Sequence, residues 1–286
     1  MLSILQVFER EIFNTDFQKY LFLLTRKQSK QVYDFVPYRF GCFSFQSYAD
    51  KRTLIKYGIL KDYDSWKKND SIDYFTQLSK DDQAILLELK MNYQSVSGKR
   101  LIRQIYNEYP YYAIKSDILE KNMNRGEIEK INQHKPKDTS PYLFSIGYEG
   151  KSFDFYLNQL VENNIKVLCD VRKNPISMKY GFSKKQLQGA LTKLGIDYVH
   201  IPDLGIASNK RKKLNAFEDY QKLFQEYEVT TLLEQSDSID KLINYIKEKK
   251  RIALTCFEAY HHDCHRNSVV KAITSKADPF FKVSHI

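Results

Sequence analysis

The sequence predicts an α/β protein: a C-terminal, mostly parallel sheet with helices on both faces, preceded by a mainly α-helical domain. Five short apolar runs alternate with helical stretches in the second half of the chain, whereas the first half shows mostly helical periodicity. A polar segment with Pro136 and Pro141 lies between the halves. We therefore assign residues 1–120 to a first domain, 121–141 to a linker and 142–286 to a second domain.

In the first half, apolar residues recur at spacings of three and four. This spacing predicts one or two helices over 4–24, another over 44–60 and two more over 79–106. Ser79 is the expected cap of this last pair, with Leu86, Leu87 and Leu89 as its apolar face. Short strands are expected around 38–43 and 58–63. The pattern favours a winged-helix-like, nucleic-acid-binding module, and a plain helical interaction domain is the alternative.

In the second half, the pattern alternates between strands and helices. The predicted strands are 142–146, 165–169, 198–201, 252–255 and 281–285. The predicted helices lie near 152–163, 183–194, 216–248 (two helices, with a break in the acidic stretch 234–240) and 265–275. Ser183 and Gly195 suit the start and end of the second helix. Such alternation predicts right-handed crossovers and a parallel sheet.

The composition narrows the class of protein. The chain has 286 residues and a net charge of +10, which divides equally between residues 1–140 and 141–286. A positive charge favours polyanions, and we expect nucleic acid, DNA before RNA, as the partner. No run of about 18 apolar residues occurs, so we expect no membrane span. Four cysteines are too few for a disulfide scaffold and indicate a cytoplasmic protein. The sequence carries no indication of the oligomeric state.

Ionisable residues follow four of the five predicted strands. In a parallel sheet, ligands bind outside the carboxyl ends of the strands. The segments that follow the strands are GYEG (147–150), DVRKNP (170–175), PDLG (202–205) and CFEAYHHDCHR (256–266). Because these segments converge on one edge of the sheet, we expect an active site there. No glycine-rich phosphate loop is present, which disfavours a dinucleotide enzyme or an NTPase.

Two carboxylates are the expected reagents of this site. We expect Asp170 and Glu258 to act as acid, base or nucleophile, for example in the cleavage of a glycosidic bond. Arg172 and Arg266 are expected to hold phosphate, and structural salt bridges between these acids and arginines are the alternative. Cys264, at a helix start after the natural cap Asp263, is a second candidate nucleophile with a lowered thiol pKa.

The last segment is also rich in soft metal ligands. Cys256, His261, His262, Cys264 and His265 lie close together in the sequence. Structural zinc sites usually add a second ligand pair some distance away, and none follows here. We therefore assign no metal and no cofactor to the site.

Two basic segments are expected to line the same edge and bind a phosphate backbone. The first provides Lys173, Lys179, Lys184 and Lys185, with Tyr180 and Phe182 available to stack on bases. The second provides Lys210, Arg211, Lys212 and Lys213. Solvated charged surfaces are the alternative.

Two stretches of the chain resemble known proteins. Residues 35–60 (FVPYRFGCFSFQSYADKRTLIKYGIL) resemble a segment of bacterial winged-helix proteins. From about residue 145 to the end, the motifs GYEG, DVRKNPIS, GFSK, LGIDYVHIPDLG and CFEAYHHDCHR resemble the family known as domain of unknown function 488. The resemblance implies a compact α/β domain with an active site and no settled reaction, found fused to other domains among genes for DNA modification, restriction and phage defence. His261 stands where family members often have proline.

The resemblance also implies functional positions. The family's motif positions fall on Tyr148, Glu149, Asp170, Arg172, Cys256, Glu258, Cys264, His265 and Arg266. Of these we expect Asp170, Glu258, Cys264 and His265 to be catalytic. We expect Tyr148, Glu149, Arg172, Cys256 and Arg266 to bind the substrate.

We therefore expect an enzyme that processes DNA or RNA, for example by removing a base in phage defence or repair. One alternative is a non-catalytic DNA-binding regulator whose α/β domain senses a small ligand. The other is a cysteine-dependent enzyme that acts on a small phosphorylated molecule.

Overall fold

The computed structural model describes residues 1–61, 64–207, 217–277 and 280–286. The chain divides into two compact units, Met1–Lys135 and Pro136–Ile286. The range 121–141, which we expected to be a linker, contains this division, but its first part is helical. Asn124 and Glu127 form a capping box that starts α7 (Arg125–Gln133). In the described ranges, no helix is long and apolar enough to span a membrane.

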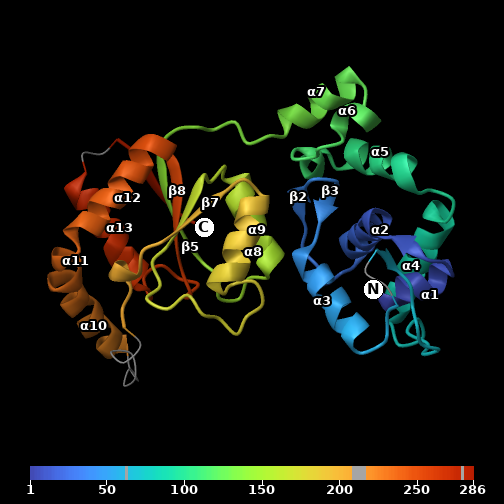
Figure 1. Cartoon of the computed structure of the whole chain (residues 1–286), viewed down its shortest axis with the longest axis horizontal. Helices are drawn as coiled ribbons and strands as arrows, with labels where there is room; N and C mark the ends of the chain where they lie inside the picture. Colours follow the sequence, from blue (N-terminus) through green and yellow to red (C-terminus); the bar gives the residue numbers. More distant parts are fainter. Residues whose placement is uncertain (62–63, 208–216, 278–279) are drawn as a thin grey trace. The chain divides into compact units, whose positions relative to one another are not determined.

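The first unit is mainly helical (Figure 1). Its helices are α1 (Leu2–Phe8), α2 (Asn14–Lys27), α3 (Phe45–Lys56), α4 (Lys80–Tyr93), α5 (Gly98–Glu108), η1 (Pro110–Ala113), α6 (Leu119–Asn122) and α7. Its strands are β1 (Ile12–Phe13), β2 (Val36–Tyr38), β3 (Gly41–Phe43) and β4 (Ser65–Trp66). Antiparallel pairs form between β1 and β4 and between β2 and β3. The winged-helix assignment stays a prediction.

Two expectations for the first unit need correction. In the described part of the strand expected over 58–63, Leu60 forms an isolated bridge with Lys68, and the strand lies further on, as β4 at Ser65–Trp66, where Trp66 stacks on Phe17 with 3.7 Å between ring centroids. Of the predicted apolar face of α4, Leu86 and Leu89 are buried but Leu87 is half exposed. The expected cap Ser79 does start α4, and Ser44 caps α3 in the same way, since each accepts a hydrogen bond from a backbone N–H three residues on.

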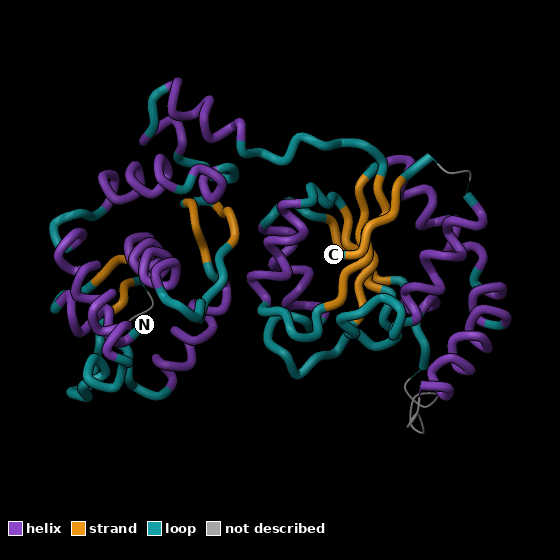
Figure 2. The backbone as a smooth tube through the Cα atoms, turned by 180° about the vertical axis from the view of Figure 1, so that it is seen from behind, coloured by secondary structure: helices purple, strands orange, loops and turns teal. Residues whose placement is uncertain are grey.

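The second unit is a five-stranded parallel sheet between two layers of helices (Figures 1 and 2). Its strands are β5 (Tyr142–Gly147), β6 (Val167–Asp170), β7 (Asp197–His200), β8 (Arg251–Cys256) and β9 (Lys282–His285), in the order β7-β6-β8-β5-β9. Its helices are α8 (Phe153–Glu162), α9 (Lys184–Lys193), η2 (Pro202–Leu204), α10 (Phe217–Val229), α11 (Thr231–Glu234), α12 (Ser236–Lys249) and α13 (His265–Lys276). The predicted α/β fold class is therefore confirmed.

Helices cover both faces of this sheet. In Figure 1, α8 and α9 lie on one face, and α10 to α13 lie on the other. Buried aliphatic residues fill the second layer, including Leu242 and Ile246 of α12 and Val269 and Ile273 of α13. Because the core fixes both the sheet and the starts of its helices, the loops at the carboxyl ends of the strands are held in place.

Candidate functional site

The parallel register brings the loops after β5, β6 and β8 to one edge of the sheet. Gly147 lies opposite Cys256, and Asp170 lies opposite Thr255. The loops are also bonded to one another, because the backbone N–H groups of Tyr148 and Glu149 both donate to the carbonyl of Phe257, at 3.1 and 2.9 Å. The segment after β7 lies against the segment after β6, because a Cβ on Gly205 would lie 2.1 Å from the backbone nitrogen of Lys173. All four predicted segments therefore meet at this edge.

Asp170 is buried beneath this edge and fully engaged. Its Oδ1 accepts from the backbone N–H and Nε of Arg172, and its Oδ2 accepts from Arg172 Nη2 at 2.5 Å and from Tyr198 Oη at 2.7 Å. The pair is bidentate and both partners are buried. Asp170 therefore holds Arg172 and Tyr198 in place.

Arg172 is bonded on its other side to the protein as well. Its Nη1 donates to Tyr148 Oη and to the carbonyl of Phe182, both at 2.9 Å. The Tyr148 ring stacks on Phe182 with 4.3 Å between centroids. Burial disfavours the charged guanidinium, but the Asp170 carboxylate outweighs burial, so the pKa of Arg172 is raised. Arg172 thus organises the site from within, and its guanidinium is committed to protein partners instead of a phosphate.

Arg266 holds the loop after β8. From the first turn of α13, its guanidinium donates to Ser145 Oγ at 2.9 Å and to the carbonyls of Glu258 and Ala259 at 2.6 and 3.0 Å. Gly147 lets this loop come close, since a Cβ there would lie 1.8 Å from the Glu258 carbonyl oxygen. Glu149 accepts a further bond from the Ala259 N–H with its carboxylate. The loop that carries Glu258 is therefore rigidly supported.

Beside this loop lies a groove of about 970 Å³. Its walls come from the loops after β5 and β8 and from helices α10 and α13. The lining residues include Glu149, Tyr220, Phe224, Glu228, Phe257, Glu258, Asp263, Cys264 and Lys271. Among the described lining residues, four acids and one lysine make the groove acidic, and the rings of α10 and of the loop after β8 give it stacking surfaces. Of the predicted catalytic residues, Glu258 and Cys264 line the groove, whereas Asp170 and His265 do not.

Behind the groove, two cysteines converge on one histidine. The Sγ atoms of Cys256 and Cys264 each lie 3.8 Å from Nδ1 of His265. All three side chains are buried, and Cys256 also donates from its thiol to Oε2 of Glu258 at 3.2 Å. The three ligand atoms lie within 4.8 Å of one another, close enough to hold one metal ion.

The thiol chemistry differs from the prediction for Cys264. Burial raises its pKa well above the ordinary value, and Cys256 and Glu258 act in the same direction against Arg266. The expected lowering by the helix start and by basic neighbours is therefore wrong. Cys264 itself, rather than Asp263, occupies the N-cap position of α13.

The two other histidines of the loop point elsewhere. His261 stacks on His285 with 3.6 Å between ring centroids and bonds to Asn267. His262 is exposed and packs against Tyr260. Neither joins the cluster of Cys256, Cys264 and His265.

The predicted basic residues have different surroundings. Lys173, Lys184 and Lys185 are exposed, whereas Lys179 is half-buried and donates to the Tyr148 carbonyl at 3.0 Å. Lys210, Arg211, Lys212 and Lys213 lie outside the described residues.

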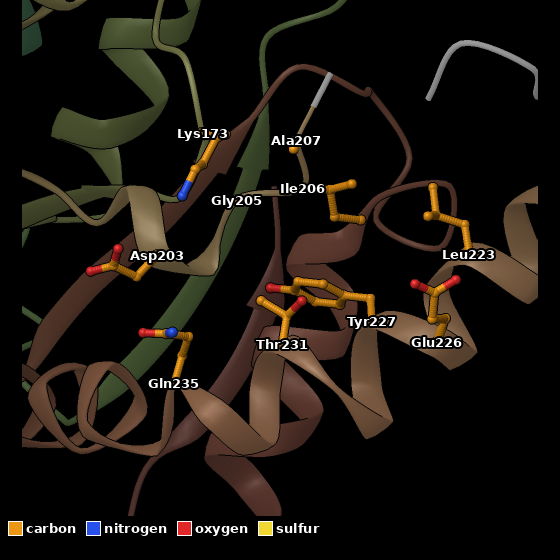
Figure 3. Close-up of a pocket in the computed structure, with 10 residues that line it drawn as sticks. All are labelled: Lys173, Asp203, Gly205, Ile206, Ala207, Leu223, Glu226, Tyr227, Thr231 and Gln235. Atoms are coloured by element: carbon orange, nitrogen blue, oxygen red, sulfur yellow. The ribbon is translucent and has the colours of Figure 1, made fainter. Parts of the chain in front are cut away.

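A second, smaller cavity of about 200 Å³ is lined by other residues of α10, Leu223, Glu226 and Tyr227 (Figure 3). Lys173, Asp203 and Gln235 lie on one side of it, and Leu223 and Glu226 lie on the other. Sites for small molecules usually measure roughly 300–1,000 Å³, so this cavity is too small for a nucleotide. The larger groove is the candidate site.

Several residues around the site were not expected from the sequence. Tyr227 of α10 packs edge-on against His265 and donates from its hydroxyl to the Leu204 carbonyl at 2.6 Å. Tyr220 and Phe224 come from the same helix. The long connection before β8 carries no motif that marks them, whereas Phe182 and Tyr198 lie inside the motifs GFSK and DYVH.

The fold and the site define the class: a parallel α/β domain with a groove at the carboxyl ends of its strands. Residues 152–273 match the sequence model of a family described as "Domain of unknown function DUF488". The second unit belongs to this family, and the match includes every site residue named above except those at β5, its following loop and His285. Comparisons with curated proteins and with solved structures gave no match.

Proposed function

We propose that the protein is a hydrolase that acts on nucleic acid, DNA in preference to RNA, and cleaves the glycosidic bond of a base held in the groove. The observation that carries this proposal is the acidic, aromatic groove beside Glu258. Its volume of about 970 Å³ suffices for a nucleoside. Enzymes that act on a base extrude it from the stack and hold it between aromatic side chains. Phe257, Tyr220 and Phe224 supply such surfaces.

The charge distribution fits an extruded base better than a bound phosphate. The acids of the groove repel phosphate, whereas exposed lysines stand outside it on the loop after β6 and at the start of α9. Backbone phosphates would therefore contact Lys173, Lys184 and Lys185 while the base enters the groove.

The loop after β6 offers a means of opening a duplex. Ile176 is 80% exposed and Met178 is fully exposed, and Lys173 and Lys179 flank them. Proteins that unstack DNA insert side chains of this kind between base steps. Such a wedge would favour entry of a neighbouring base into the groove.

Glu258 is suited to the chemical step. In hydrolysis of a glycosidic bond, water adds to the sugar C1′, and the C–N bond breaks with its electron pair passing to the base. A carboxylate stabilises the positive charge that develops on the sugar and takes the proton of the water. Glu258 is half-buried, lines the groove, and its backbone is fixed by Arg266.

The first unit adds a second basic surface to the proposal. Arg52, Lys56 and Tyr57 are exposed along and just after α3, in the segment that resembles winged-helix proteins. We propose that it contacts nucleic acid, in a phage-defence or repair setting that the family resemblance suggests. The four cysteines, all within the described ranges, are buried thiols outside any disulfide, which supports a reducing, cytoplasmic location.

The test incubates the purified chain with unmodified and with hypermodified phage DNA and measures released base by mass spectrometry. We expect free base from the wild type and a rate reduced by about 10²–10⁴ in Glu258→Gln, the usual contribution of a general acid or base. Glu228→Gln is the matched control. Glu228 lines the same groove, but its carboxylate is paired with Nζ of Lys271 at 3.8 Å. Equal rates in the wild type and Glu258→Gln, or no released base from either DNA, would refute the proposal.

A further inference from the structure

Cys256, Cys264 and His265 form a cluster with the composition and placement of a metal site. Cys256 is the last residue of β8, and Cys264 and His265 open α13. The chain leaves the sheet at Cys256 and folds back at Cys264, the N-cap of α13, so both thiols and the imidazole meet behind the groove. Thiol and imidazole are the donors that zinc prefers in proteins.

The two sulfur–nitrogen separations fit a tetrahedral zinc ion. With Zn–S near 2.3 Å and Zn–N near 2.0–2.1 Å, tetrahedral angles place a sulfur and a nitrogen ligand about 3.6 Å apart. Both Sγ–Nδ1 distances here are 3.8 Å. A shift of about 0.2 Å would therefore give ideal S–Zn–N geometry, well within ordinary side-chain movement.

The histidine already presents the correct nitrogen. Nε2 of His265 lies 3.1 Å from the carbonyl oxygen of Val171. A carbonyl only accepts, so Nε2 carries the proton and the lone pair of the neutral ring is on Nδ1, between the two sulfurs. Metal-binding histidines are commonly fixed in this way by a backbone carbonyl on their other nitrogen. Tyr227 packs against the ring and supports the same orientation.

The rest of the loop is organised around the cluster. Arg266 and the backbone of Tyr148 and Glu149 hold residues 257–259 by hydrogen bonds. Glu258 accepts a hydrogen bond from the Cys256 thiol, whose proton must leave when a metal binds. The ligands are therefore pre-arranged before any ion enters.

We propose that Cys256, Cys264 and His265 bind one zinc ion that adjoins the groove through Cys264. Three protein ligands leave the fourth position to water or substrate, as in catalytic zinc sites. When bound there, zinc would supply a Lewis acid and a more acidic water. The proposal does not depend on the glycosidic reaction, because zinc binding is measured without any nucleic acid.

The experiment measures metal binding to the full chain. Protein purified under reducing conditions and freed of metal is titrated with zinc in competition with a chromophoric chelator, and then with cobalt(II). We expect one zinc per chain and a cobalt spectrum with thiolate charge-transfer and tetrahedral d–d bands. Cys256→Ser, Cys264→Ser and His265→Gln should weaken zinc binding by more than about 100-fold, the upper range for removal of a supporting hydrogen bond alone.

Two variants serve as controls. His262→Gln changes a histidine of the same loop outside the cluster, and Cys42→Ala removes a buried cysteine of the first unit, so both should keep wild-type zinc affinity. If a ligand variant does not fold, the wild-type stoichiometry and the thiolate bands still decide the question. Less than stoichiometric zinc, cobalt spectra without thiolate bands, or a Cys256–Cys264 disulfide in the reduced preparation would overturn the proposal.

Discussion

Asp170 and Arg172 illustrate how two residues of a functional motif act on the site indirectly. Every oxygen of the carboxylate accepts a hydrogen bond, and every nitrogen of the guanidinium donates one inside the protein. Together they position Tyr148, Tyr198 and the backbone at Phe182. From sequence alone, an acid and a base after a strand look the same whether they face a ligand or each other.

Asp170→Asn should therefore act mainly on stability. Removing one charge of a buried pair leaves the other uncompensated, which typically costs about 3–5 kcal/mol. Urea denaturation with far-UV circular dichroism measures the free energy of unfolding. Asp197→Asn, which breaks the exposed pair with Lys249, is the control and should change the free energy far less. Similar small decreases in the two variants would contradict the internal role of Asp170.

His285 gives a second prediction at the residue scale. Its side chain is exposed, but its ring stacks on His261, and its pKa lies below the ordinary 6.5 because partial desolvation, His261 and Arg266 all disfavour its charged form. The unfolded chain then takes up a proton more readily than the folded chain as the pH falls through 6.5. The free energy of unfolding should therefore keep its full value above pH 6.5. It should decline as the pH falls from 6.5 to the lowered pKa of His285.

Thermal unfolding between about pH 5 and 7.5 tests this sign, in the range where histidine titrates. We expect the decline on the acid side to be smaller in His285→Asn than in the wild type. NMR titration of the His285 ring gives its pKa directly. A pKa at or above 6.5, or an unchanged acid-side decline in the variant, would contradict the prediction.

At the scale of elements, the order of strands and helices in the second unit was predictable. The apolar runs that alternate with amphipathic stretches coincide with β5 to β9, α8, α9 and α13. The range 216–248, where two helices were expected, holds three, α10 to α12, and one of its breaks lies near Gln235 as predicted. Side-chain partners were not predictable. The pairing of Arg266 with the carbonyls of its own loop, and of Tyr227 with His265, depends on how α10 and α13 pack, and periodicity does not report that.

The cysteine and histidine cluster shows the same limit. In the sequence, Cys256 and Cys264 lie further apart than the paired cysteines of ordinary zinc sites, and no second pair of ligands follows. The turn between β8 and α13 removes that separation by folding the chain back. The carbonyl of Val171, which orients His265, comes from a different strand end altogether.

The first turn of α9 provides a prediction at the element scale. Lys184 and Lys185 are exposed at the N-terminus of this helix, where backbone N–H groups and the helix dipole also favour an anion. Changing both to Gln should weaken binding to duplex DNA. It should also lower the slope of log K against log salt by up to about 1.8, near 0.9 for each phosphate that a lysine no longer neutralises.

Fluorescence anisotropy over a range of salt concentrations measures both quantities. The matched control is Lys241→Gln with Lys247→Gln, which removes the same charge from α12. If the two double variants bind with the same affinity and the same salt slope, the lysines of α9 only keep the surface charged.

At the scale of the whole molecule, the chain consists of two units, each with its own core and its own sheets. All described strand pairs lie within one unit: β1 to β4 belong to the first and β5 to β9 to the second. We therefore expect residues 1–135 and 136–286 to fold as separate fragments. The single tryptophan, Trp66, is buried against Phe17, so its fluorescence reports only on the first unit.

In denaturant, the tryptophan transition of the whole chain should match that of fragment 1–135 in midpoint and slope, because the slope follows the surface exposed on unfolding. The far-UV signal of the whole chain should equal the sum of the two fragments at every denaturant concentration. Trp66→Phe in the whole chain removes the fluorescence signal and controls for tyrosine emission from the second unit. A fragment that lacks a cooperative transition, or a tryptophan midpoint that moves when residues 136–286 are removed, would mean that each unit needs the other for its stability.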